Sequence, residues 1–83
     1  MNVEVSLFGF GEDRPPSFGR NDRLELTLDQ PATVADALDQ AGFPELAGLS
    51  AMLNNALVPP RKWQDTQLSD GDALKVLLAI EGG

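Results

Sequence analysis

Cysteine and histidine are both absent from the 83 residues of this sequence. Without cysteine there can be no disulfide, thiol nucleophile or thiolate metal ligand, and without histidine there is no imidazole acid–base chemistry. Carboxylates are the side chains left for catalysis. No apolar run approaches transmembrane length, and the first residues alternate in polarity instead of forming a signal peptide. We therefore expect a cytoplasmic protein.

Basic residues are also scarce, because six Lys and Arg side chains accompany thirteen Asp and Glu, for a formal net charge of -7. Such a surface repels phosphate backbones and anionic lipids, so we expect neither nucleic acid nor a membrane as a partner. A protein partner with a complementary basic face fits better, since opposite potentials speed encounter and fix orientation. The apolar content of 42% is ordinary for one small folded domain.

Two segments near the start, residues 2–7 and 23–28, alternate apolar with polar residues. This period of two predicts two strands, each with one face on a core, which pair as an antiparallel hairpin. Residues 9–22 between them are rich in Gly, Pro and charge, which predicts an exposed loop. Phe10 and Phe18 in this loop are candidates for an exposed docking site.

A helix is predicted after Thr33, because Thr33 and Asp36 form a typical N-terminal cap and Gly42 supplies a stop. The apolar residues that follow the cap recur at helical spacing: Val34, Ala37, Leu38 and Ala41. They form a single stripe, so the helix must lie against a sheet.

The remaining strands are shorter or more apolar. Residues 51–58 predict two short strands around Asn54 and Asn55, a pair that tolerates the positive φ angles of a tight turn. Residues 73–80 predict a last strand whose two alternating sets are both largely apolar, which is typical of a strand in the middle of a sheet. The sequence leaves open which of the two sets is buried.

This order of elements predicts an α+β domain with the β-grasp (ubiquitin-like) fold, in which one main helix packs across a mixed sheet of four to five strands. We expect a single domain over residues 1–80 and a flexible C-terminal Gly-Gly tail over residues 81–83. Gly82 and Gly83 lack a Cβ atom and can enter a narrow channel that bulkier residues would block. Activation of a terminal carboxylate needs a nucleotide-binding enzyme, and the chain has no P-loop.

Several motifs together resemble the ThiS/MoaD family of sulfur carriers, which serve thiamine and molybdopterin synthesis. They are Leu57-Val58-Pro59, Trp63, Leu68, Asp70-Gly71-Asp72, the apolar strand to Ile80, and Gly82-Gly83. The resemblance implies that an E1-like adenylyltransferase of the ThiF/MoeB type adenylates the Gly83 carboxylate. A sulfur donor then forms a thiocarboxylate, which passes sulfur on with thiazole synthase or the molybdopterin synthase large subunit as partner. It also implies a carrier, not an enzyme, with no cofactor of its own and with ATP used by the partner.

The motifs leave the pathway open. The basic residue that usually follows Val-Pro in the thiamine carriers is displaced here by Pro60, so that Arg61 stands one position later. Leu7-Phe8-Gly9 and the long first loop are more similar to the molybdopterin carriers, whereas the Trp63 segment is more similar to the thiamine carriers.

For a carrier, we expect the exposed sheet face and the tail to bind the partner. The candidate contact residues are Leu53, Leu57, Leu77, Ala79 and Glu81. Trp63 is interpreted as a packing residue, and Asp70 and Asp72 as turn formers. Two alternatives remain: a ubiquitin-like modifier conjugated through Gly83, and a non-catalytic β-grasp binding module that ignores the terminus.

Overall fold

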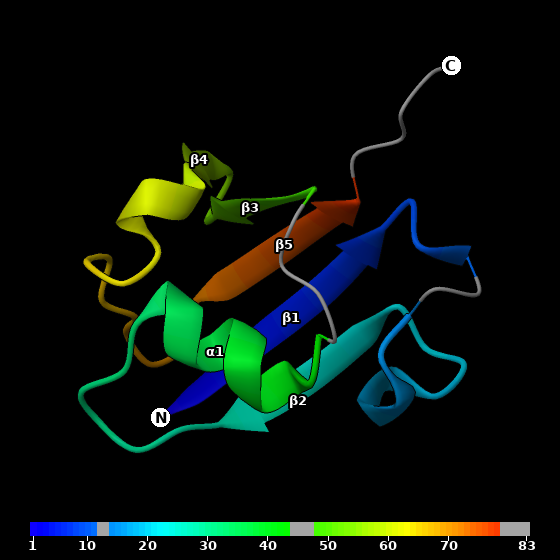
Figure 1. Ribbon diagram of the computed structural model, residues 1–83. Coiled ribbons are helices and arrows are strands. Elements are labelled where there is room, and N and C mark those ends of the chain that lie inside the picture. The colour runs from blue at the N-terminus through cyan, green and yellow to red at the C-terminus, as the bar shows by residue number, and fades with distance from the viewer. Residues whose placement is uncertain (12–13, 44–47, 79–83) are drawn as a thin grey trace.

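A five-stranded mixed sheet with one α-helix across one of its faces forms the body of the protein (Figure 1). The computed structural model describes residues 1–11, 14–43 and 48–78. The elements are β1 (Asn2–Phe8), η2 (Pro16–Phe18), β2 (Arg23–Thr27), α1 (Val34–Ala41), β3 (Leu49–Leu53), β4 (Ala56–Val58), η3 (Pro60–Lys62) and β5 (Ala73–Leu78). The predicted β-grasp fold is confirmed, whereas the predicted tail over residues 81–83 lies outside the described residues.

The sheet has the strand order β2-β1-β5-β3-β4, so the last strand is the central one, as predicted. β1 pairs with β2 in the predicted antiparallel hairpin and with β5 in parallel. β3 pairs antiparallel with both β4 and β5. β5 is paired along both of its edges, and it is apolar at every position except Lys75.

The helix α1 begins as its sequence predicts. The Thr33 hydroxyl accepts a hydrogen bond from the Asp36 backbone N–H, and the Asp36 carboxylate accepts one from the Thr33 N–H. This reciprocal pair satisfies two N–H groups that would otherwise lack partners. Gly42 ends the helix at a φ of 86°, a left-handed conformation that favours glycine.

The core lies between α1 and the sheet. On β5 the buried set is Leu74 and Val76, which settles the parity that the sequence left open. The other buried hydrophobic residues of the strands and helix are Val3, Val5, Leu7, Leu26, Val34, Ala37, Leu38, Ala41, Leu49, Ala51 and Val58. None of the helices in the described ranges is long and apolar enough to cross a membrane.

The turn between β3 and β4 has the predicted geometry, with φ angles of 49° at Asn54 and 70° at Asn55. The Asn54 side chain donates a hydrogen bond to the Asp72 carboxylate at 3.0 Å and accepts one from the Ala73 N–H at 3.0 Å. This pair of bonds ties the β3–β4 hairpin to the start of β5. Asp72 also accepts from the Ser69 N–H, which confirms its role as a turn former.

The segment from residue 9 to 22 differs from its prediction, because its aromatic side chains are buried. Phe10 is 6% exposed and Phe18 is 2% exposed, so neither can form the expected exposed docking site. Both rings contact Phe43, with centroid separations of 5.6 and 6.0 Å. The polar and Pro-rich composition does not reveal that two aromatic side chains close the core beside the end of α1.

Trp63 packs as predicted. Its ring is 5% exposed, and its indole Nε1–H donates a hydrogen bond to the Val58 carbonyl at 2.8 Å. Val58 is the last residue of β4, and Trp63 follows η3 directly. The bond therefore closes η3 onto the edge of the sheet.

Candidate functional site

We call the face of the sheet opposite α1 the open face. It bears several apolar side chains. Because side chains alternate along a strand, the residues between the buried ones point to this side. They include the apolar residues Phe8, Met52, Leu57 and Leu77, the basic residue Lys75, and the polar or acidic residues Glu4, Ser6 and Ser50. α1 covers the other side, as Figure 1 shows.

The strand register shows how the apolar members of the open face are arranged. Leu77 lies between Phe8 of β1 and Ser50 of β3. Met52 lies between Lys75 of β5 and Leu57 of β4. The apolar side chains therefore form two pairs: Phe8 with Leu77 near the ends of β1 and β5, and Met52 with Leu57 across β3 and β4, level with Lys75 in the middle of β5.

Two members of the open face are unusually accessible. Phe8 is 48% exposed and Leu57 is 66% exposed, and they are the only large hydrophobic side chains exposed among the described residues. Exposed apolar groups on a small soluble domain are typical of sites where another protein binds. The open face is therefore the candidate interaction surface.

The predicted contact residues do not all lie together. Leu57 and Leu77 lie on the open face, whereas Leu53 points to the opposite side, where it packs partly buried against the core. Ala79 and Glu81 lie outside the described residues, as do Gly82 and Gly83. Contact of these residues with a partner stays a prediction.

The sequence alone does not identify Phe8, Met52 and Lys75 as members of the open face. Phe8 follows the polar residues Glu4 and Ser6 on the same face of β1, so its strand alone gives no apolar pattern there. The signal lies across strands, in the parallel pairing of Phe8 with Leu77. A sequence does not display such a pairing directly.

Two of the acidic side chains, Asp70 and Asp72, lie in the turn before β5. Asp70 accepts a hydrogen bond from the Asn2 N–H at 2.7 Å and Asp72 stabilises its turn, so both have structural roles. In the described part of the chain, no group of three or more acidic side chains is arranged to hold a metal ion.

The position of β5 relates the open face to the end of the chain. Leu78 is the last described residue of β5, one residue beyond the pair of Leu77 with Phe8. The strand thus ends beside the pair of Phe8 and Leu77, at the side of the sheet where Figure 1 shows the β1 and β5 arrowheads.

A central β5 parallel to β1, one helix across the sheet and an apolar face opposite it define a ubiquitin-like β-grasp protein. The model of the ThiS family matches residues 10–83, and the chain belongs to this family. Members of the family are small carrier proteins and not catalysts. No curated protein sequence matches the chain.

Solved structures of three kinds of protein share the fold: SAMP1, a thiamine biosynthesis protein and a molybdopterin-converting factor. SAMP1 from Haloferax volcanii has a TM-score of 0.72 and 20% identity, with full coverage of both chains. The thiamine biosynthesis protein ThiS from Geobacter metallireducens has a TM-score of 0.68 and 18% identity, covering 100% of this chain and 99% of its own. A complex of subunits 1 and 2 of molybdopterin-converting factor from Helicobacter pylori matches with a TM-score of 0.61, 26% identity and full coverage of both chains.

Proposed function

We propose that this protein is a sulfur carrier whose Gly83 carboxylate is adenylated by an E1-like enzyme of the ThiF/MoeB type and then converted to a thiocarboxylate. The observation that supports this most is the family match, which extends through residues 82 and 83. The thiocarboxylate would donate its sulfur in the synthesis of a cofactor. The carrier itself would be the substrate of its partner enzymes.

In this proposal the open face and the tail have separate tasks. Phe8, Leu57 and Leu77 bind the partner and fix the orientation of the domain. Gly82 and Gly83 enter the partner's active site, where the absence of Cβ atoms lets the backbone approach closely. Leu53, Ala79 and Glu81 are further candidate contacts, and ATP is bound by the partner.

In the proposal the thiocarboxylate delivers its sulfur by one of two routes. The second partner is thiazole synthase in one route and the molybdopterin synthase large subunit in the other. The related Helicobacter pylori structure is a complex of two subunits of molybdopterin-converting factor, and the Geobacter metallireducens structure is a thiamine biosynthesis protein. One similarity supports each route.

The test is incubation with ATP, sulfide and the ThiF/MoeB-type adenylyltransferase of the same organism. We expect pyrophosphate release and a mass gain equal to the replacement of one oxygen atom by sulfur. The chain has no cysteine, so a persulfide cannot account for added sulfur. A chain lacking Gly82 and Gly83 should stay unchanged, and the proposal fails if the intact chain also stays unchanged.

A second candidate is a protein modifier that is conjugated through Gly83 to lysine side chains. It is favoured by the structural similarity to SAMP1 from Haloferax volcanii and to the small archaeal modifier protein 1 from Methanosarcina acetivorans. Isopeptide-linked adducts in extracts of the source cells would support this function. A third possibility, a binding module that does not use its terminus, predicts full function after removal of Gly82 and Gly83.

A further inference from the structure

The two outer strands of the sheet, β2 and β4, differ in how well their free edges are protected. β4 has three residues, the carbonyl of its last residue Val58 accepts the hydrogen bond from Trp63, and Pro59 follows directly. Short strands and prolines are common means of preventing an edge from pairing with another chain. β2 has five residues and no proline, so its edge lacks both protections.

Alternate residues of β2 direct their backbone groups away from the sheet. At the end of the strand the Leu28 N–H donates a hydrogen bond to the Met1 carbonyl at 2.8 Å, so the even-numbered residues of this segment bond to β1. The odd-numbered residues Arg23, Glu25 and Thr27 therefore face outward. We call the outward N–H and C=O groups of the first two, Arg23 and Glu25, the β2 window.

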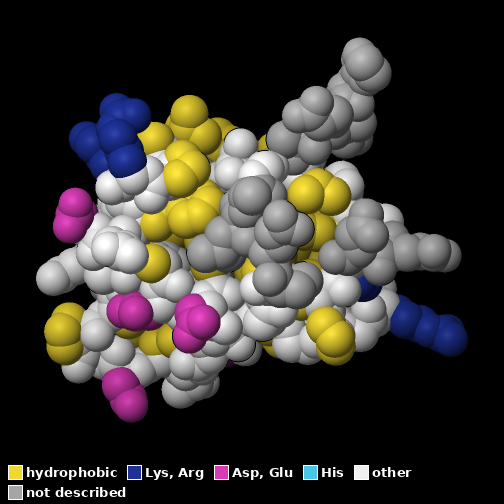
Figure 2. Space-filling model, in the orientation of Figure 1, with side chains coloured by type: hydrophobic (Ala, Val, Ile, Leu, Met, Phe, Trp, Pro, Cys, Tyr) yellow, Lys and Arg dark blue, Asp and Glu magenta, His cyan; other side chains and the backbone are white. Residues whose placement is uncertain are grey.

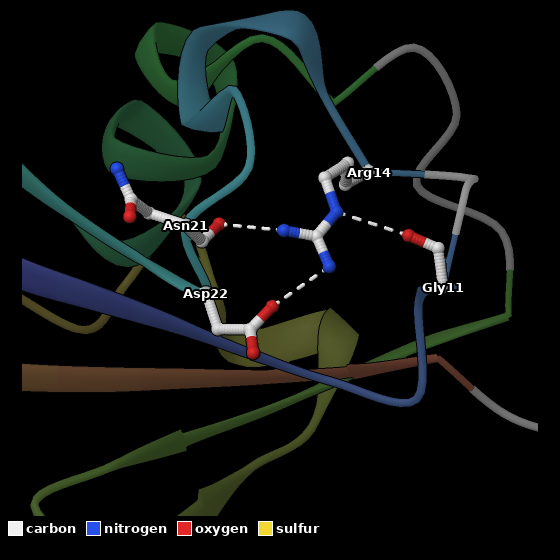
Figure 3. A network of polar contacts seen from close by, with 4 residues as sticks. All are labelled: Gly11, Arg14, Asn21 and Asp22. Atoms are coloured by element: carbon white, nitrogen blue, oxygen red, sulfur yellow. Dashed lines mark hydrogen bonds and ion pairs between the residues drawn. The ribbon is translucent and has the colours of Figure 1, made fainter.

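The chain's own side chains occupy a carbonyl on either side of the β2 window. Gln40 of α1 donates a hydrogen bond to the Thr27 carbonyl at 3.0 Å. Arg14 donates one to the Asn21 carbonyl at 2.8 Å, and Figure 3 shows its guanidinium group holding the residues just before β2. The groups of the β2 window itself form no hydrogen bond with any described residue. Two adjacent outward-facing residues are therefore left to pair with another strand.

The side chains beside the β2 window carry opposite charges. Arg23 lies 3.8 Å from Glu4 in an exposed ion pair, whereas Glu25 forms no ion pair with any residue in the described ranges. Glu4 and Glu25 lie directly opposite each other on β1 and β2, and like charges in that position destabilise a sheet. A further cation beside Glu25 would therefore stabilise this edge.

We propose that two copies of this chain pair through their β2 strands, antiparallel, with Arg23 of each copy opposite Glu25 of the other. Each of these two residue pairs would exchange two backbone hydrogen bonds across the new edge. A shift by two residues in either direction would place Arg23 opposite Arg23, or Glu25 opposite Glu25. The next residue pair would then include Asn21 or Thr27, whose carbonyls already accept hydrogen bonds. Charge and hydrogen bonding therefore favour the same register.

The net charge of -7 opposes the association of two copies. At physiological ionic strength, screening limits the reach of a surface charge to about 8 Å, so the charges facing each other across the new edge dominate. One strand buries less surface than a standard protein interface, and we expect a weak dimer that forms at about 0.1–1 mM protein. Three strands separate β2 from β4, so pairing leaves Leu57 exposed. A dimer of this kind does not depend on activation of Gly83.

The experiment exchanges the charges beside the β2 window. Arg23→Glu places acidic groups opposite each other in both residue pairs, and Glu25→Arg places basic groups there. Each variant alone should dimerise about tenfold more weakly than the wild-type chain, measured by sedimentation equilibrium, because opposed like charges replace opposed unlike ones. An equimolar mixture of the two variants restores both unlike pairs and should associate as the wild type does.

Matched controls reverse the same charges beside the other edge of the sheet. Arg61→Glu and Asp65→Arg change the net charge by the same amounts, and both residues are exposed in or just after η3, where Figure 2 shows Lys and Arg side chains gathered. Because these charges lie far from the β2 window, both controls should keep the dimer affinity within about twofold. Circular dichroism of each variant checks that it folds.

Amide hydrogen exchange tests the backbone pairing independently of the charges. The N–H groups of Arg23 and Glu25 should exchange several-fold more slowly at about 1 mM than at about 0.05 mM protein. A wild-type chain that stays monomeric at about 1 mM, or a dimer in which these two groups exchange equally fast at both concentrations, would overturn the inference. The same holds if the mixed variants associate no better than each alone, or if the controls weaken the dimer equally.

Discussion

Replacement of Leu57 by threonine tests whether the open face binds the partner. Leu57 is 66% exposed, so docking can remove about two thirds of its side-chain surface from water. Full burial of a leucine side chain contributes about 1.5–3 kcal/mol, so the exposed part contributes about 1–2 kcal/mol on docking. That free energy corresponds to an affinity about 5–30 times weaker for Leu57→Thr.

The assay is calorimetric titration of the adenylyltransferase, with urea unfolding of each variant as the measure of stability. Threonine suits an exposed edge strand, so the free energy of unfolding should change by less than about 0.5 kcal/mol. The control is Ala56→Thr, which introduces the same residue on the same strand but on the other side of the sheet. Unchanged affinity for Leu57→Thr, or an equal loss for Ala56→Thr, would refute the assignment of the open face.

Three further predictions concern the scaffold. Trp63→Phe leaves the buried Val58 carbonyl without its donor and should lower the free energy of unfolding by about 1–3 kcal/mol in urea titrations. Thr33→Ala removes the cap of α1 and should cost about 0.5–2 kcal/mol, measured by thermal unfolding with circular dichroism at the helix wavelength. Asn55→Val should cost about 1 kcal/mol or more at its φ of 70°, whereas Asn55→Gly should not, and equal unfolding midpoints for the two variants would contradict the turn geometry.

Local patterns predicted most of the fold. The alternation of residues 2–7, the cap at Thr33 and the Asn54-Asn55 pair are each determined by neighbours in the sequence, and the structure confirms all three. The central position of β5 could also be predicted, because residues 73–80 are largely apolar in both alternating sets, which is typical of a strand in the middle of a sheet.

Features that depend on distant contacts could not be predicted in the same way. Phe10 and Phe18 lie in a polar, Pro-containing segment, and their burial depends on Phe43, which is far away in the sequence. The buried parity of β5 depends on which side α1 covers, and Leu74 and Leu77 look equivalent until that side is known. The pairing of Phe8 with Leu77 likewise depends on β1 and β5 lying side by side.

The most direct measurement of the central proposal is the location of the sulfur atom after the complete reaction with ATP, sulfide and adenylyltransferase. The C-terminal peptide of the reacted protein is isolated and fragmented in a mass spectrometer. We expect the whole oxygen-to-sulfur mass change to reside in Gly83. Sulfur at any other residue, or an unmodified Gly83 in a chain that has bound its partner and ATP, would contradict it.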